Sequence, residues 1–308
     1  MSKNKTENSS FEKFNRVSAT TNIIFTCIFF LIALACVIPL IFIFIISISS
    51  NESIVSQGYS FFPKEFSASA YEYLWNIKGS MGKSFLVSVF ITVGGTAFGV
   101  MLNAAMGYVL SRKNYKYKKF FTYIIFIPMV FNGGMVASYM INTQVLMLKN
   151  TVWALILPIA VSSFYIIILR TFFQTTVPDS IIESAKIDGA NQFVIFTKLV
   201  LPISLPGLAA IGLFLSFAYW NDWFLAMLYM DDQGLFPLQY VLKRIERNVE
   251  FLATNGALIG NTTELANRLP SETIRMAIVM VVVLPIAVTY PFFQKYFISG
   301  LTIGAVKG

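Results

Sequence analysis

Residues 178–202 read PDSIIESAKIDGANQFVIFTKLVLP, a short charged segment in a chain whose other long stretches are mostly apolar. Its first half predicts a short helix followed by a turn. Ser180 and Glu183 have the Ser-x-x-Glu spacing of a capping box, which marks the start of a helix. Gly189 stands where the end of a helix favours a residue that tolerates positive φ. The segment therefore begins with a helix of about two turns.

The second half of this segment predicts another short helix. Asn191 can cap its start, because an asparagine side chain accepts a hydrogen bond from the first turn. We expect Leu201–Pro202 to end it, since proline has no N–H and biases the residue before it away from helical dihedral angles. A helix-turn-helix between two apolar stretches is the local prediction.

Composition places the rest of the chain in a membrane. Hydrophobic residues make up 56% and charged residues 12%, whereas about 25% are charged in an average soluble domain. A bilayer needs about 20 apolar residues per helix, so we predict an all-α fold with six transmembrane helices. Pro128 and Gly133-Gly134 predict a broken or tilted third span. The six stretches are 21–48, 84–111, 120–146, 151–172, 203–230 and 273–297.

Lysine and arginine predict the orientation, because short cytoplasmic loops collect them. Five occur in residues 112–119, and the loop between the third and fourth spans has only Lys149. We therefore expect both termini and residues 173–202 to be cytoplasmic. The net charge is +8, but the basic residues are distributed by membrane side, so we expect no nucleic-acid partner. The predicted parts are an N-terminal tail (1–20), the first span with an external loop (21–83), a five-helix core (84–297) that contains the loops 178–202 (cytoplasmic) and 231–272 (external), and a C-terminal tail (298–308).

Three motifs resemble the permease subunits of ABC importers. Glu183-Ser184-Ala185, Gly189 and Leu199-Val200-Leu201-Pro202 have the spacing of the family's EAA loop, with Ser184 for alanine and Leu199 for isoleucine. Tyr108-Val109-Leu110-Ser111-Arg112 and the tail 290–308 resemble segments of the carbohydrate-type members. Asn132-Gly133-Gly134 and Phe236–Tyr240 are similar to the subgroup that handles oligosaccharides.

This resemblance implies a type I ABC importer permease, moving a carbohydrate across the cell membrane by alternating access. Its partners would be a cytoplasmic ABC ATPase dimer, a second, non-identical permease and an extracytoplasmic substrate-binding protein. The EAA loop would dock on the ATPase as a coupling helix. The docking residues carried over in this way are Glu183, Ser184, Ala185, Asp188, Gly189, Leu201 and Pro202.

We expect no catalytic site, cofactor or metal in this chain. Gly82-Lys83-Ser84 looks like the end of a phosphate-binding loop, but that pattern needs glycine where Ile77 stands. ATP and Mg²⁺ would be used by the partner ATPase, so the chain is a transport subunit and not an enzyme. The chain contains no histidine, which excludes histidine metal sites.

Polar residues in the predicted spans are candidates to line a substrate path, because ionisable and polar groups are costly in lipid. The alternatives are helix packing, interface anchoring and, for the two isolated asparagines, interhelical hydrogen bonds. Asp222 also raises a rival function, a proton-coupled secondary transporter that needs no ATPase. The substrate-lining candidates are Tyr219, Trp220, Asn221, Asp222, Asn103 and Asn132.

Overall fold

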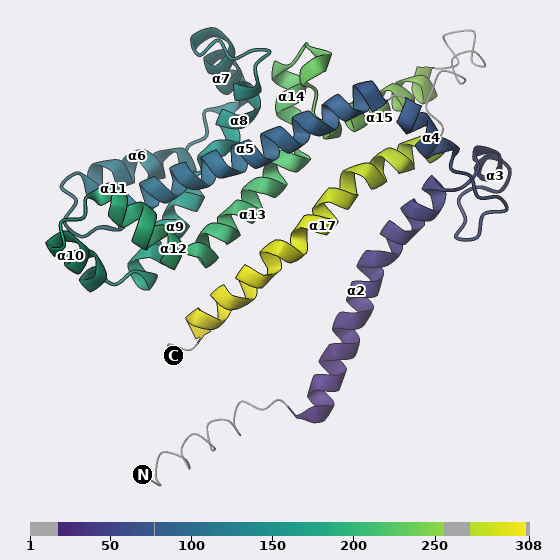
Figure 1. Ribbon diagram of the computed structural model, residues 1–308. Helices are drawn as coiled ribbons and strands as arrows, with labels where there is room; N and C mark the ends of the chain where they lie inside the picture. The colour runs from purple at the N-terminus through teal and green to yellow at the C-terminus, as the bar shows by residue number, and fades with distance from the viewer. Residues whose placement is uncertain (1–17, 77, 256–271, 306–308) are drawn as a thin grey trace. The chain divides into compact units, whose positions relative to one another are not determined.

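The computed structural model describes residues 18–76, 78–255 and 272–305 (Figure 1). Helices and their connections account for these ranges, and the one strand-like pairing within them is an isolated bridge between Ser49 and Phe66. The chain divides into two compact units. One comprises Met1–Ala70 and Ser271–Met280, and the other comprises Tyr71–Pro270 and Val281–Gly308.

The smaller unit contains α2 (Ala19–Ser47) and α3 (Asn51–Gln57). Ser18 caps α2 by accepting a hydrogen bond from the Thr21 amide at 3.2 Å. The apolar side chains of α2 are exposed around most of its circumference. A helix that is apolar on every side suits a lipid environment and not water. The predicted first span is confirmed in this helix.

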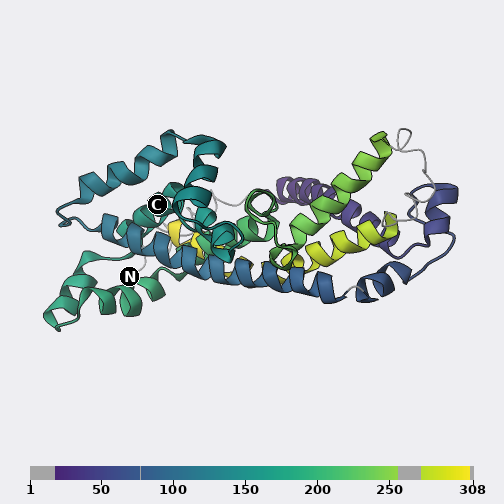
Figure 2. The ribbon, with the colours of Figure 1, turned by 90° about the horizontal axis from the view of Figure 1, so that it is seen from above.

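The larger unit is built around α5 (Lys78–Ser111), the long helix that Figure 2 shows running past the other helices of the unit. Three helices pack on it: α8 (Val152–Ala160), α9 (Ser163–Thr176) and α13 (Leu205–Asn221). Their buried contacts include Leu155, Leu169 and Leu215. Close packing depends on small residues in α5, as expected where helices meet in a membrane.

By length and composition, up to six spans result when each bent helix pair is counted as one. Three single helices are long and apolar enough to cross a membrane: Ala19–Ser47, Met81–Ser111 and Glu272–Thr289, the last within α17 (Glu272–Ala305). Three bent pairs complete the set. They are Lys118–Val130 with Gly134–Val145 (120°), Val152–Ala160 with Ser163–Thr176 (50°), and Gln192–Ile203 with Leu205–Asn221 (83°).

The break in the third span confirms the prediction made from its proline and glycines. It divides the span into α6 (Lys118–Val130), α7 (Gly134–Met140) and a π-helical turn, η1 (Ile141–Val145). The fourth and fifth spans differ from the continuous stretches that we predicted. The fourth is broken between α8 and α9, and the fifth continues after α13 as the separate α14 (Phe224–Tyr229).

Two long connections were predicted as external loops. The first contains α3 and α4 (Ser69–Asn76). The second contains a short 3-10 helix, η3 (Gln233–Leu235), and α15 (Leu238–Asn255), which has the amphipathic pattern expected from its sequence. The remainder of that loop, residues 256–271, lies outside the described residues, as do most of the N-terminal tail and the last three residues.

Candidate functional site: a helical loop fastened to α5

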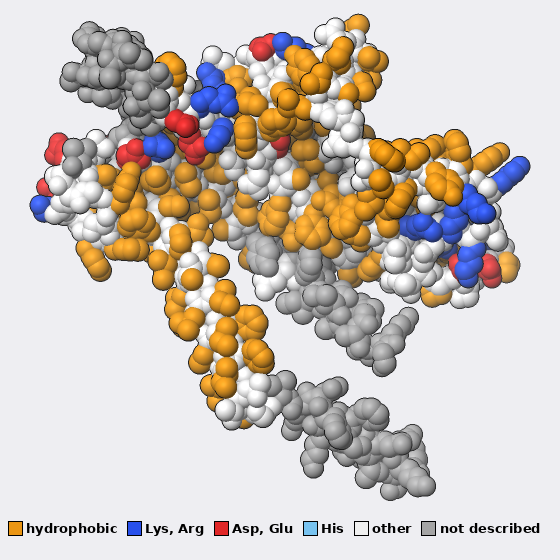
Figure 3. Space-filling view, turned by 180° about the vertical axis from the view of Figure 1, so that it is seen from behind, with side chains coloured by type: hydrophobic (Ala, Val, Ile, Leu, Met, Phe, Trp, Pro, Cys, Tyr) orange, Lys and Arg blue, Asp and Glu red, His pale blue; other side chains and the backbone are white. Residues whose placement is uncertain are grey.

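The charged segment forms two helical pieces, as its sequence predicts. The first is α10 (Asp179–Ile187); the second runs through α11 (Gln192–Ile195), the π-helical turn η2 (Phe196–Val200) and α12 (Leu201–Ile203). Figure 3 shows Lys, Arg, Asp and Glu side chains gathered at the end of the unit that holds α10, whereas hydrophobic side chains cover its middle. The loop is therefore a polar element at the end of an apolar bundle.

Backbone geometry between the helical pieces confirms the role predicted for Gly189. Its φ is +81°. Its amide donates to the Lys186 carbonyl at 3.0 Å, and the Ala190 amide donates to the Ala185 carbonyl at 2.9 Å. This pair of bonds is the Schellman ending of a helix. Asn191 then caps α11 as predicted, since its Oδ1 accepts from the Val194 amide at 2.8 Å.

Two local predictions for the loop were wrong. The capping box of Ser180 and Glu183 does not form, because α10 begins two residues earlier, with Pro178 in place of Ser180 as its N-cap. Proline has no side-chain acceptor to offer, and the Ile181 amide donates to the Pro178 carbonyl at 3.3 Å. Pro202 does not stop the second piece, which continues to Ile203. The preceding π turn accommodates it, because the regular i to i−4 bonding is already interrupted.

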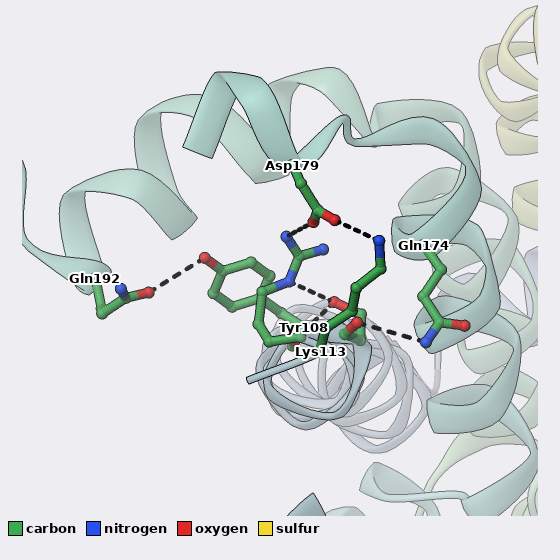
Figure 4. Close-up of polar contacts among 7 residues, drawn as sticks. Tyr108, Lys113, Gln174, Asp179 and Gln192 are labelled. Atoms are coloured by element: carbon green, nitrogen blue, oxygen red, sulfur yellow. Dashed lines mark hydrogen bonds and ion pairs between the residues drawn. The ribbon is translucent and has the colours of Figure 1, made fainter. Parts of the chain in front are cut away.

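Asp179, at the start of α10, is bound by two cations that follow the end of α5. Its Oδ1 lies 3.3 Å from Arg112 Nη1 and its Oδ2 lies 2.9 Å from Lys113 Nζ. Figure 4 shows the carboxylate between the two cationic groups. Arg112 is the better fixed partner. Its side chain is 18% exposed against 81% for Lys113, and its Nε donates to Ser111 Oγ at 3.0 Å.

These cations also set the charge state of Asp179. The hydrogen bond from Lys113, together with the positive charges of Lys113 and Arg112, lowers the pKa of the carboxyl below its usual value. A lowered pKa means that the ion pairs contribute above the usual carboxyl pKa and are lost only as the pH falls through the lowered one. Asp179 is therefore charged at neutral pH.

A second contact joins α11 to α5. Tyr108 Oη donates to Gln192 Oε1 at 3.3 Å (Figure 4). The Tyr108 ring packs at 5.3 Å from Phe196 and at 6.3 Å from Phe173, measured between ring centroids. The Arg112 guanidinium lies 5.1 Å from the centre of the same ring. We call Tyr108, Arg112, Lys113, Asp179 and Gln192 together the α5 anchor.

The two faces of α10 differ in what they contact. Ile182 and Ala185 are buried in the hydrophobic core of the unit. Ala185, which the resemblance assigned to docking, therefore does not lie on the exposed face and packs within its own chain. Leu201 is half-buried. The other residues predicted to dock are exposed: Glu183, Ser184, Asp188, Gly189 and Pro202.

Two large apolar residues on the exposed side were not among the predicted docking residues. Ile187 is 86% exposed and Phe193 is 74% exposed, and they flank the turn at Gly189. The sequence does contain a signal for them, because both are apolar residues directly beside a glycine turn in a polar segment. Periodicity alone does not separate them from buried residues such as Ile182.

Asn103, a candidate for the substrate path, is fully buried and connects α5 to the break between α8 and α9. Its Nδ2 donates to the carbonyls of Gly99 at 2.6 Å and Ala160 at 2.7 Å. Its Oδ1 accepts from the Ser162 amide at 3.1 Å. The side chain thus binds backbone groups that the break leaves without helical partners. This is the interhelical hydrogen bonding that its isolated position in the span suggested.

The other candidates fall into two groups. Tyr219 and Trp220 are buried, and each donates to a backbone carbonyl, of Ile156 at 2.8 Å and of Val282 at 3.0 Å respectively. Asn221 and Asn132 are exposed. Asp222 lies between α13 and α14 and accepts from the Leu225 amide, at 3.3 and 3.4 Å from its two oxygens. The structure therefore brings Tyr219 and Trp220 into the packed bundle and leaves the two asparagines at its surface.

Comparison with known proteins identifies relatives of the whole chain. No family model matches the chain. The permease protein YtcP of a polygalacturonan/rhamnogalacturonan transport system of Bacillus subtilis is 39% identical over 278 residues, which cover 90% of this chain and 94% of that protein. Protein LplC of the same organism is 36% identical over 272 residues, covering 88% and 90%.

A solved structure extends the likeness to the fold. One chain of a bacterial ABC transporter involved in the import of the acidic polysaccharide alginate matches with a TM-score of 0.77 and 30% identity, covering 92% of this chain and 99% of that one. These findings do not favour the proton-coupled alternative. The chain, an all-α multi-pass membrane protein with a type I importer fold, therefore belongs to the permease family of carbohydrate ABC importers.

Proposed function

We propose that this chain is one permease subunit of an ATP-driven, binding-protein-dependent importer that moves an oligosaccharide across the cell membrane by alternating access. A separate ATPase dimer on the cytoplasmic side hydrolyses ATP with Mg²⁺, and the chain itself has no nucleotide site. A second, non-identical permease completes the pore, and an extracytoplasmic binding protein delivers the sugar. Both termini of the chain are cytoplasmic in this arrangement.

The observation that carries the proposal is the exposure of Ile187 and Phe193 on a polar loop. Large apolar side chains beside charged ones mark a surface that another protein covers, and aromatic side chains often dominate such contacts. Glu183, Ser184, Asp188 and Gly189 lie on the same loop and complete the surface that we assign to the ATPase. Ala185 and Leu201 support it from the side of the bundle.

We propose uronate-containing oligosaccharides as the substrate class. The support is chemical likeness between two relatives: YtcP is named for polygalacturonan and rhamnogalacturonan, and the structural relative imports the acidic polysaccharide alginate. Each of these polymers carries carboxylate groups. Asn132, Asn221 and Asp222 remain candidates to line the path, and Asn103, Tyr219 and Trp220 would act by holding its walls in place.

The test is a tagged chain extracted gently from its native membrane, with co-purifying proteins identified by mass spectrometry. We expect an ABC ATPase and a second permease. Phe193→Asp should lower ATPase recovery at least about tenfold, because an interface aromatic can contribute 2 kcal/mol or more and 1.4 kcal/mol is tenfold. Phe62→Asp is the matched control, since Phe62 is 88% exposed and lies far from this loop in the sequence.

Uptake in the same cells tests the substrate class. Labelled oligogalacturonides should enter cells that have the chain and not cells that lack it, whereas a neutral oligosaccharide of equal length should enter both equally. Recovery of the wild-type chain without any ATPase, in a folded and monodisperse state, would contradict the importer. Equal loss of ATPase in both aspartate variants would contradict the docking surface but not the importer.

A further inference from the structure

The loop is covalently connected to α9 and α13, and both connections bend. Pro178 separates α9 from α10 with an extended backbone, at φ −62° and ψ 136°. Ser204 separates α12 from α13, and the helices on its two sides differ in direction by 83°. A push on α10 would be partly absorbed at such bends. The bundle is packed on α5, which does not adjoin the loop in the sequence.

The α5 anchor adds a polar connection at two separate places to the apolar packing of Ile182 and Ala185 on the bundle. Asp179 fastens α10 through both of its carboxylate oxygens. Gln192 fastens α11 through the Tyr108 hydroxyl. Both contacts are made by the last turn of α5 and the two residues after it. Tyr108 lies in that turn, and Arg112 and Lys113 follow its end directly. The two halves of the loop are therefore both held to one helix end.

Of the two cations, Arg112 is held by further hydrogen bonds. Ser111 Oγ, which accepts from Arg112 Nε, donates in turn to the Tyr108 carbonyl at 2.6 Å. Gln174 of α9 donates to the Ser111 carbonyl at 3.4 Å (Figure 4). A carboxylate bound by two cations, one of them fixed by further bonds, resists both sliding and rotation. The anchor thus constrains direction as well as distance.

We propose that the α5 anchor is a positioning device that carries movement of the loop into α5, with Asp179, Arg112 and Gln192 as its positioning residues. The inference rests on the proposed function, in which an ATPase moves the loop. Because α8, α9 and α13 all pack on α5, displacement of its end displaces the bundle. Without the anchor, the ATPase still docks on Ile187 and Phe193, but less of its movement reaches α5, because the bends absorb part of it.

The test uses the complete complex in proteoliposomes and measures uptake per ATP hydrolysed, together with the amount of ATPase assembled. Asp179→Asn removes the charge and keeps the shape. We expect normal assembly and a fall of about threefold in uptake per ATP, the factor that corresponds to loss of a partly exposed ion pair. Lys119→Gln is the matched control, since it removes one exposed charge from the first turn of α6, outside the anchor, and should change neither quantity.

Two further variants separate positioning from mere stability. Tyr108→Phe deletes only the hydroxyl that binds Gln192 and should lower uptake per ATP without the charge change. The reversed set, Arg112→Glu and Lys113→Glu with Asp179→Arg, should recover part of the uptake per ATP that Asp179→Arg loses alone. Rescue of this kind requires the contact and not simply a folded loop.

The outcomes are distinct. Unchanged uptake per ATP in Asp179→Asn and Tyr108→Phe, with the complex assembled, would overturn the proposal. So would a loss of assembled complex with an unchanged ratio, because that result describes a structural role only. If the wild-type chain brings no ATPase with it, the proposed function fails first, and this result is seen before any variant is made.

Discussion

Gly189 is the residue on which the shape of the loop depends most directly. Its φ of +81° lies where side chains with a Cβ are strained, although a Cβ there would meet no atom within 4 Å. Gly189→Val should therefore cost about 1–2 kcal/mol of backbone strain without any clash. We expect this variant to insert normally and to lose transport coupled to ATP.

Uptake assays on membranes with equal amounts of each variant test this expectation. Gly189→Asn should be milder, because asparagine adopts the left-handed conformation more readily than valine. Gly82→Val is a useful control, since Gly82 has open space and no positive φ. If the valine variant at position 189 transports as well as the wild type, the assignment of this turn to coupling is wrong.

At the scale of the element, α5 is shaped by close approach to its neighbours. A Cβ at Gly99 would lie 2.8 Å from the Ala160 carbonyl oxygen, which is backbone and cannot rotate away. Gly99→Ala should thus destabilise the bundle by about 1–3 kcal/mol. Gly94→Ala should be neutral or stabilising, because Gly94 lies in the same helix with nothing within 4 Å.

Thermal unfolding of the purified chain in detergent measures this difference. Each kcal/mol should lower the melting temperature by about 2 °C, because the shift is about 2–4 °C for 150–250 residues and decreases with chain length. Equal melting temperatures for the two alanine variants would mean that α5 and α8 separate easily. The packing described for this pair would then contribute little to stability.

Elements also show how far the sequence can predict this fold. Apolar stretches predicted α2 and α5, and Pro128 with Gly133-Gly134 predicted the break in the third span. The break at Val161–Ser162 was not predicted, because it depends on Asn103, which lies some sixty residues earlier and binds the Ala160 and Ser162 backbone. Helix breaks that are satisfied by a distant side chain leave little local trace, although Pro158 lies in the preceding turn.

The residues of the candidate site likewise divide into those that the local sequence predicts and those that depend on distant contacts. Gly189 and Asn191 could be assigned from local turn chemistry, since each acts through its own backbone region. The role of Asp179 could not, because its partners Arg112 and Lys113 come from another loop. Burial of Ala185 and exposure of Ile187 likewise depend on how α10 rests on the bundle, which helical periodicity over nine residues does not determine.

For the whole molecule, the distribution of Lys and Arg predicts which side of the membrane each loop faces. We expect a cysteine at Lys119 to be cytoplasmic and one at Phe62 to be external. Single cysteines can be placed after Cys27 and Cys36, which are free thiols, are replaced by serine. A membrane-impermeant maleimide should label Phe62→Cys in intact cells and Lys119→Cys only after permeabilisation.

Serine at positions 27 and 36 without a new cysteine gives the background for this labelling. Labelling of Lys119→Cys in intact cells would reverse the predicted orientation. It would also place the loop 178–202 outside, where no ATPase could reach it. The topology experiment therefore bears on the proposed mechanism as well as on the location of the termini.

The two-sided construction of the loop 178–202 has an evolutionary consequence. Ile182 and Ala185 pack α10 on its own bundle, whereas Ile187 at the end of α10 and Phe193 in α11 are exposed. With the ATPase docked as we propose, substitutions at the outward positions would alter which ATPase the permease binds and would leave the packing of the permease itself unchanged. The choice of energy-supplying subunit could therefore change in evolution independently of the fold.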